Sequence, residues 1–361
     1  MKLKKLAVVF SAAALAAVMA GCSGGQKEAA AVAETTAAET AAETAAEAAA
    51  ESASETEADK AAADAKQSME ENAPEAEDEE NYDTGDASLD DPRNQDEIGE
   101  NELLVVSFGT SYNDSRRLTI GAVEGAIEKA FPDYSVRRGF TSQIIIDHVK
   151  SRDQVSIDSV AEALDRAAEN GVKNLVVQPT HLMNGLEYTD LVNELAEYSD
   201  AFEKIAVGKP LLTSDEDFEA VIRTITEATA QYDDGETAVC FMGHGTEAES
   251  NQVYSRMQDM LTEAGYANYY IGTVEAEPSL EDVLVAVRQG NYKKVVLEPL
   301  MIVAGDHANN DMAGEEEDSW KTVFEKAGYE VTCLVRGLGE MEGIQQLFVE
   351  HAQAAADSLS K

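Results

Sequence analysis

Eight short apolar runs alternate with amphipathic segments between about residue 100 and the C-terminus. Apolar runs without regular polar interruptions are typical of strands that are buried on both faces of a parallel sheet. The segments between them carry apolar residues at helical spacing. Strands are predicted over residues 103–108, 134–139, 174–178, 204–207, 237–242, 269–273, 294–298 and 330–334. Helices are predicted over residues 114–129, 160–170, 218–232, 249–264, 280–289 and 341–359. We therefore expect an α/β fold with parallel sheets covered by helices on both faces.

The second part of this pattern repeats the first. Residues 173–179, with Gly185 beyond them, match residues 293–299, with Gly305 at the same spacing. Residues 104–109 likewise match residues 238–243. Chance similarity of apolar strands is the alternative, but the matched Pro and Gly positions favour duplication. We expect two similar α/β halves, residues 100–208 and 209–361, with a cleft between them at the carboxyl ends of the strands.

The N-terminus has the pattern of a targeting segment. Residues 1–5 are basic, residues 6–20 are apolar, and small residues precede Cys22. This arrangement predicts a secretory signal peptide over residues 1–21. Cys22 directly after Ala-Gly resembles a bacterial lipoprotein cleavage box, which implies lipidation of Cys22 and a membrane-anchored, extracytoplasmic protein. An ordinary signal peptide with an incidental Cys is the alternative.

Residues 22–99 form a segment rich in Ala, Glu, Thr and Asp. Such a composition has too few large apolar residues to bury a core, so we expect a disordered acidic tether. The whole chain has 70 acidic and 27 basic residues, a formal net charge of −43. This balance argues against nucleic acid as a partner, because binding there depends on Lys and Arg. It suits a cation.

The cysteines do not indicate a thiolate metal site, because the chain contains no Cys-x-x-Cys sequence. Cys240 and Cys333 lie in strand-like runs and are expected to be small buried residues. Whether they pair is left open by the sequence.

Candidate metal-ligating residues follow the predicted strands in the second half. His244 and His307 follow two of these strands, and two carboxylates, Glu275 and Glu277, follow a third. Imidazole and carboxylate together suit a divalent metal such as cobalt, iron or nickel. Three protein ligands leave coordination positions open for a substrate. A neutral His can also accept a proton near neutral pH.

Several motifs resemble those of the anaerobic-pathway sirohydrochlorin cobalt chelatases, which are relatives of the ferrochelatases. The resemblance extends from about Leu103 to the C-terminus. Its motifs are residues 107–112, 140–142 and 178–185 in the first half and residues 243–246, 272–275 and 299–307 in the second.

The resemblance implies a chelatase-like fold that holds a tetrapyrrole between its halves. It implies His244, Glu275 and His307 as metal ligands and His244 as the proton acceptor. Glu277 is the competing carboxylate, because Ala276 and Glu277 stand where the family often has Gly and an aromatic residue. The activity implied is insertion of Co²⁺ into sirohydrochlorin in cobalamin or tetrapyrrole biosynthesis, with Fe²⁺ and Ni²⁺ also suited to these ligands. The chain has no phosphate-cradling Gly-x-x-x-x-Gly-Lys-Ser/Thr motif, so no nucleotide is expected.

The side groups of the substrate are carboxylates and need hydrogen-bond donors. Gly109, Thr110 and Ser111 precede a predicted helix, whose N-terminus favours anions. Arg116 and Arg117 lie one turn further on, where a solvated helix face is the alternative. His181 either faces the ring from the first half or is a structural loop residue.

Four further residues have expected structural or supporting roles. Asp306 either orients His307 or caps the following helix. His148 and His351 are expected on polar helix faces without a chemical role, and Trp320 in the core.

Two other functions remain compatible with the sequence. A cell-surface protein of this fold could bind haem, a corrinoid or a metal for uptake. A solute-binding protein of unrelated chemistry is the third hypothesis. The sequence leaves a homo-oligomer open.

Overall fold

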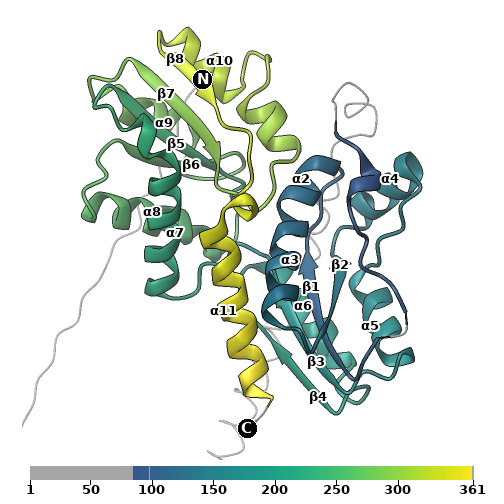
Figure 1. Ribbon diagram of the computed structural model, residues 1–361. Helices are drawn as coiled ribbons and strands as arrows, with labels where there is room; N and C mark the ends of the chain where they lie inside the picture. Colours follow the sequence, from purple (N-terminus) through teal and green to yellow (C-terminus); the bar gives the residue numbers. More distant parts are fainter. Residues whose placement is uncertain (1–83, 97, 360–361) are drawn as a thin grey trace, which may run out of the picture. The chain divides into compact units, whose positions relative to one another are not determined.

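The computed structural model describes residues 84–96 and 98–359 (Figure 1). The predicted signal peptide, Cys22 and most of the predicted tether lie outside the described residues. Strands and helices alternate along the described chain, as predicted. The strands are β1 (Asn101–Ser107), β2 (Ser135–Phe140), β3 (Asn174–Pro179), β4 (Lys204–Val207), β5 (Thr237–Gly243), β6 (Tyr269–Thr273), β7 (Lys294–Pro299) and β8 (Glu330–Cys333). The main helices are α2 (Asn113–Leu118), α3 (Ile120–Ala130), α4 (Gln143–Asp153), α5 (Val160–Glu169), α6 (Leu186–Glu197), α7 (Asp215–Thr229), α8 (Gln252–Glu263), α9 (Leu280–Val287), α10 (Trp320–Lys326) and α11 (Glu342–Ser358).

The strands form two parallel sheets with the same internal order. The first sheet has the order β2-β1-β3-β4, and the second has the order β6-β5-β7-β8. Each strand of the second sheet therefore occupies the place of its counterpart in the first, which agrees with the repeat in the sequence. The predicted fold class is confirmed: two similar α/β halves with parallel sheets.

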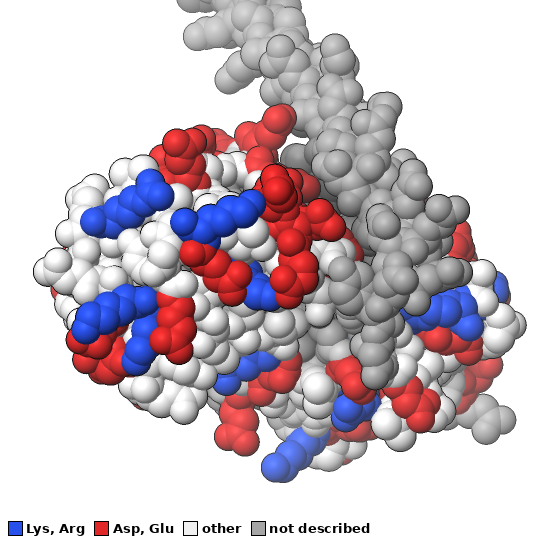
Figure 2. Space-filling view, turned by 90° about the horizontal axis from the view of Figure 1, so that it is seen from above, with Lys and Arg blue, Asp and Glu red and all other residues white. Residues whose placement is uncertain are grey.

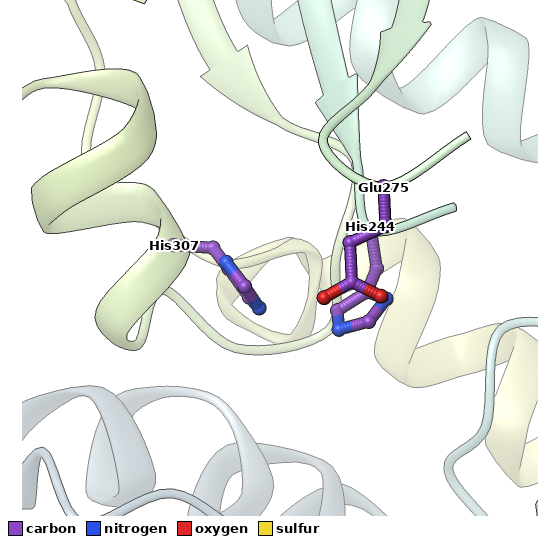
Figure 3. Close-up of side chains that lie close together, drawn as sticks. All are labelled: His244, Glu275 and His307. Atoms are coloured by element: carbon purple, nitrogen blue, oxygen red, sulfur yellow. The ribbon is translucent and has the colours of Figure 1, made fainter. Parts of the chain in front are cut away.

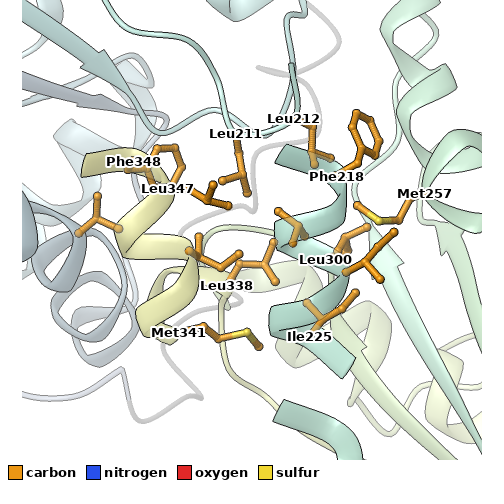
Figure 4. Packing of buried hydrophobic residues seen from close by; sticks show 14 of the residues in the cluster. Leu211, Leu212, Phe218, Ile225, Met257, Leu300, Leu338, Met341, Leu347 and Phe348 are labelled. Carbon is orange, nitrogen blue, oxygen red and sulfur yellow. The ribbon is translucent and has the colours of Figure 1, made fainter. Parts of the chain in front are cut away.

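Both faces of each sheet are buried, and one core joins the two sheets. Alternate residues of a strand point to opposite faces, so Val105 and Phe241 contribute to the shared core while Leu104 and Cys240 contribute to separate outer clusters. Figure 4 shows part of the shared core, where residues of α7 and α11 pack together.

The last helix returns from the second half to the first. α11 packs against α3, β3 and β4 of the first half and against α7 (Figure 1). Phe348, with no exposed surface, lies in the shared core. The boundary between the halves at residues 208 and 209 stays a prediction.

Two local predictions were wrong, and Trp320 was placed correctly. The helix predicted over residues 114–129 breaks at Thr119, whose φ of −109° and ψ of −77° separate α2 from α3. The Thr119 hydroxyl donates a hydrogen bond to the Ser115 carbonyl at 2.5 Å, and such a side-chain hydrogen bond competes with helical geometry.

His351 was predicted on a polar helix face, but it is buried, and its Nε2 lies 3.0 Å from the Asp217 carboxylate. Trp320 is buried, as predicted.

The end of the predicted tether has a defined position against the first half. Asp90 accepts hydrogen bonds from Arg116 Nε and Arg138 Nη1, both at 2.7 Å. The two arginine side chains have no exposed surface. Residues 84–96 therefore pack against the first half, within the range predicted as tether. The Arg116 side chain is buried in an ion pair with Asp90. This corrects the expectation that Arg116 lies on a solvated helix face or near a substrate.

The two cysteines do not form a disulfide. Both are free, and each is paired in register with Leu297 of the intervening strand β7. Neighbouring strands lie about 4.8 Å apart, so the two positions are separated by about 10 Å. A disulfide requires Cα atoms within about 7 Å.

The surface carries charges of both signs. On the face shown in Figure 2, Lys and Arg side chains lie among Asp and Glu side chains rather than in one continuous patch. Among the described residues, no helix has the length and apolar character needed to cross a membrane.

Candidate metal centre

The second sheet brings three predicted residues to one edge. β6, β5 and β7 are neighbours and run parallel, so their carboxyl ends meet. His244 follows β5 by one residue, Glu275 follows β6 by two, and His307 follows β7 after a longer loop. Figure 3 shows the three side chains converging.

The loop that carries His244 has its shape because glycines flank this residue. A Cβ at Gly243 would lie 2.2 Å from the Tyr254 ring, and one at Gly245 would lie 2.8 Å from the Ala276 nitrogen. Gly245 also has a φ of +91°, in the left-handed region that favours glycine. The Glu275 nitrogen donates to the His244 carbonyl at 2.9 Å, so the two loops are held together.

Asn251 provides a second connection between these loops. Its side-chain oxygen accepts from the Thr246 nitrogen at 3.0 Å, and its side-chain nitrogen donates to the Glu277 carbonyl at 2.6 Å. The Glu277 carboxylate instead accepts from the Ser279 nitrogen at 3.2 Å, at the start of α9. Glu275 is therefore the carboxylate that lies with the two histidines.

The three residues have the spacing of a metal site. One ligand atom from each lies within 4.8 Å of the others, and this is the one such group of His, Cys, Asp or Glu among the described residues. Metal–ligand bonds of about 2.0–2.2 Å place the ligands of one ion about 3–4 Å apart. Small side-chain movements would therefore let all three reach one divalent ion. Their role as ligands stays a prediction.

Both imidazoles have one ring nitrogen engaged by an oxygen. His244 Nδ1 lies 2.9 Å from the Gly245 carbonyl, and His307 Nδ1 lies 2.7 Å from the Asp311 carboxylate. An oxygen acceptor at Nδ1 favours the tautomer in which Nε2 carries the free lone pair. Both Nε2 atoms are thus prepared to bind a metal.

The surroundings of His307 favour positive charge. Burial lowers its pKa, but the hydrogen bond and charge of Asp311, with Glu275 and Asp306, outweigh burial and leave the pKa raised. A cation at this position is stabilised for the same reason. Asp306, predicted either to orient His307 or to cap the following helix, accepts from the Asn310 side chain at 2.6 Å.

The first half contributes His181 and Glu187. His181 is buried with neither ring nitrogen hydrogen-bonded, and its Nε2 lies 3.6 Å from Glu187 Oε2. Burial lowers the pKa of His181 to about 4, so its imidazole is neutral. Desolvation raises the pKa of Glu187 to about 7, although the charge of His244 opposes this effect.

Glu187 was missed by the sequence analysis, although the internal repeat contains a signal for it. Glu187 follows Pro179 by eight residues, and His307 follows Pro299 by eight. The repeat therefore gives Glu187 and His307 equivalent places in the two halves.

The predicted substrate-binding loop is largely buried. Gly109, Thr110 and Ser111 are all buried, and Thr110 Oγ1 would lie 3.2 Å from a Cβ at Gly305. The loop therefore packs against the segment that leads to His307. The following helix, α2, has only six residues. Substrate binding by Gly109, Thr110, Ser111 and His181 stays a prediction.

The fold and the His–Glu–His cluster define a protein with two paired α/β halves and a candidate metal centre in the second. The profile of the cobalt chelatase (CbiK) family matches residues 101–357. The chain belongs to this family, which confirms the resemblance inferred from the motifs.

Two relatives support this assignment across nearly their whole length. The sirohydrochlorin cobaltochelatase of Salmonella typhimurium (strain LT2) is 36% identical, covering 70% of this chain and 95% of that protein. The sirohydrochlorin cobaltochelatase CbiKC of Nitratidesulfovibrio vulgaris (strain Hildenborough) is 31% identical, covering 71% of this chain and 91% of that protein. The solved structure of SirB from Bacillus subtilis with Fe³⁺ shares the fold, with a TM-score of 0.52 and 13% identity over 73% of this chain and 98% of that one.

Proposed function

We propose that this chain inserts Co²⁺ into sirohydrochlorin without a nucleotide. The observation that carries the proposal is the approach of His244, Glu275 and His307 to within 4.8 Å at one sheet edge. Membership of the cobalt chelatase family and the names of the two relatives support the same substrate pair. Fe²⁺ and Ni²⁺ suit the same ligands and are the alternative metals.

The reaction exchanges one divalent ion for two protons. Two nitrogens of the tetrapyrrole lose their protons and form bonds to the metal as the metal leaves its protein ligands. His244, Glu275 and His307 hold the ion with positions open for the ring nitrogens. A carboxylate whose conjugate acid has a pKa close to the working pH is an effective proton acceptor.

Two groups can accept the protons. His244 is the acceptor that the family resemblance implies. Glu187, whose pKa is raised to about 7 and whose charge interacts with that of His244, is a second. His181 lies 3.6 Å from Glu187, but burial lowers its pKa to about 4, well below that of Glu187, so His181 does not take the proton on.

An insertion assay tests the proposal. The full chain is mixed anaerobically with sirohydrochlorin and Co²⁺, without ATP, and the absorbance change of the ring is followed. We expect turnover well above the uncatalysed rate. No turnover, together with tight binding of finished cobalt-sirohydrochlorin, would support the alternative in which the chain captures a haem, corrinoid or metal for uptake. The same assay with Fe²⁺ and Ni²⁺ determines the metal preference.

The proposed location is outside the cytoplasm, with lipid on Cys22 as the membrane anchor. The basic start, the apolar run and the small residues before Cys22 support this proposal. Metabolic labelling with a radioactive fatty acid tests it. Label should enter the parent chain and be lost in Cys22→Ser.

A further inference from the structure

The two candidate histidine ligands differ in what holds their second ring nitrogen. His244 Nδ1 faces a neutral backbone carbonyl, that of the adjacent Gly245. His307 Nδ1 faces a carboxylate, that of Asp311, at 2.7 Å. The first partner belongs to the backbone and cannot be removed by substitution. The second partner is a side chain, which lies four residues further along the chain and is hydrogen-bonded to the imidazole.

The position of Asp311 follows from the helix in which it lies. His307 immediately precedes the π-helical turn Ala308–Met312, and Asp311 lies within that turn. The turn brings the Asp311 carboxylate back against the His307 ring, whose side chain is 25% exposed. The other nearby carboxylate, Asp306, accepts from Asn310 at 2.6 Å.

An ionised carboxylate can only accept a hydrogen bond. The proton between Asp311 and His307 therefore resides on Nδ1, and the lone pair of His307 is on Nε2. A hydrogen bond of this kind also fixes the orientation of the ring. The two rings lie 4.7 Å apart between centroids and nearly perpendicular, at 86°, an arrangement that rotation of His307 would destroy.

We propose that Asp311 is a positioning residue, which holds His307 in the tautomer and orientation that receive the incoming metal ion. The inference rests on the proposed function, since it assigns the metal to His307. It adds a residue outside the cluster of His244, Glu275 and His307.

A graded set of substitutions separates hydrogen bonding from charge. Asp311→Ala removes both the acceptor and its charge, whereas Asp311→Asn keeps an acceptor oxygen and loses only the charge. Asp306→Ala is the matched control, because it removes a nearby charge and leaves the His307 hydrogen bond. Asp311 is 43% exposed at its side chain, so its variants should fold. Circular dichroism and thermal melts check this expectation.

Two measurements without tetrapyrrole provide the test. Nitrogen-15 NMR of the metal-free protein, recorded at a pH high enough for His307 to be neutral, reports the tautomer of each histidine, and calorimetric titration reports the dissociation constant of Co²⁺. Asp311→Ala should lose the single Nδ1–H tautomer at His307 and bind Co²⁺ about 10- to 100-fold more weakly. Asp311→Asn should retain the tautomer and lose less affinity. In the insertion assay, Asp311→Ala should raise KM for Co²⁺ more than it lowers kcat.

Two outcomes would overturn the inference. One is an unchanged His307 tautomer and Co²⁺ affinity in Asp311→Ala. The other is an equal loss in Asp311→Ala, Asp311→Asn and Asp306→Ala, which would indicate charge alone. If the parent chain binds Co²⁺ but does not insert it, the proposed function fails while the binding and tautomer results still decide the role of Asp311.

Discussion

At the residue scale, the chemical role of the candidate ligands can be separated from a structural one. His244 and His307 have side chains that are 35% and 25% exposed, so neither fills a closed core position. We expect His244→Ala and His307→Ala each to abolish Co²⁺ insertion while the melting temperature changes little. His148→Ala on α4 is the control and should keep full activity. Unfolding of both variants would instead make the two histidines structural.

The raised pKa of His307 predicts how metal binding depends on pH. Burial lowers this pKa, but Asp311, Glu275 and Asp306 raise it further, so the metal-free imidazole stays protonated to a higher pH than usual. Co²⁺ binds only the unprotonated ring and must displace the proton. Affinity should therefore fall as the pH decreases, beginning above about pH 6.5, the ordinary value for His. Calorimetric titrations between about pH 8 and pH 5.5 check this, and constant affinity down to about pH 6.5 would contradict it.

At the element scale, the segment before β1 places one buried carboxylate, that of Asp90, between two buried arginines. Burial raises the pKa of Asp90, but Arg138 and Arg116 outweigh burial and hold this pKa below its usual value. Asp90 therefore stabilises the fold above its ordinary pKa of about 3.9, and this stabilisation is lost as the pH falls through the lower folded value.

Asp90→Asn should lower the free energy of unfolding at pH 7 by about 3–5 kcal/mol, because it leaves the buried Arg116 guanidinium without its carboxylate partner, whereas Arg138 keeps Glu124 at 2.8 Å. Urea unfolding measures the change. The exposed neighbour gives the control: Asp91→Asn should change stability by less than about 0.5 kcal/mol. Equal effects of the two substitutions would show that the Asp90 contacts do not anchor the segment.

At the scale of the whole molecule, α11 connects the two halves. It follows the second sheet in the chain and packs against the first, and its residues belong to a core that both sheets share. A helix in this position holds the two halves together without contributing a side chain to the metal cluster.

Phe348→Ala should therefore destabilise both halves together. Removal of a fully buried Phe ring costs about 3–5 kcal/mol through lost burial and the cavity that remains. Urea unfolding followed by hydrogen exchange should show a single transition at lower urea, with amides of β1 and β5 losing protection together. Val192→Ala, at a half-exposed position on α6, should have little effect. Loss of protection in β1 alone would show that the halves unfold separately.

The sequence by itself determined the strands, the parallel α/β class, the duplication and the three candidate ligands. These features are local. A strand that is buried on both faces has an apolar run as its sequence, His244 and Glu275 lie within two residues of a strand end, and His307 lies in the loop after a third strand. The family motifs are likewise continuous stretches of chain.

Only the tertiary structure decided the remaining features, because each depends on residues far apart in sequence. The Asp90 contacts with Arg116 and Arg138, the return of α11 to the first half and the burial of His351 are of this kind. The choice of Asp311 rather than Asp306 as the partner of His307 is local in sequence, but it required the π-helical turn. The pattern of hydrophobic residues does not predict that geometry. Asp306 and Asp311 are both close to His307 in the sequence, so sequence distance alone does not distinguish them.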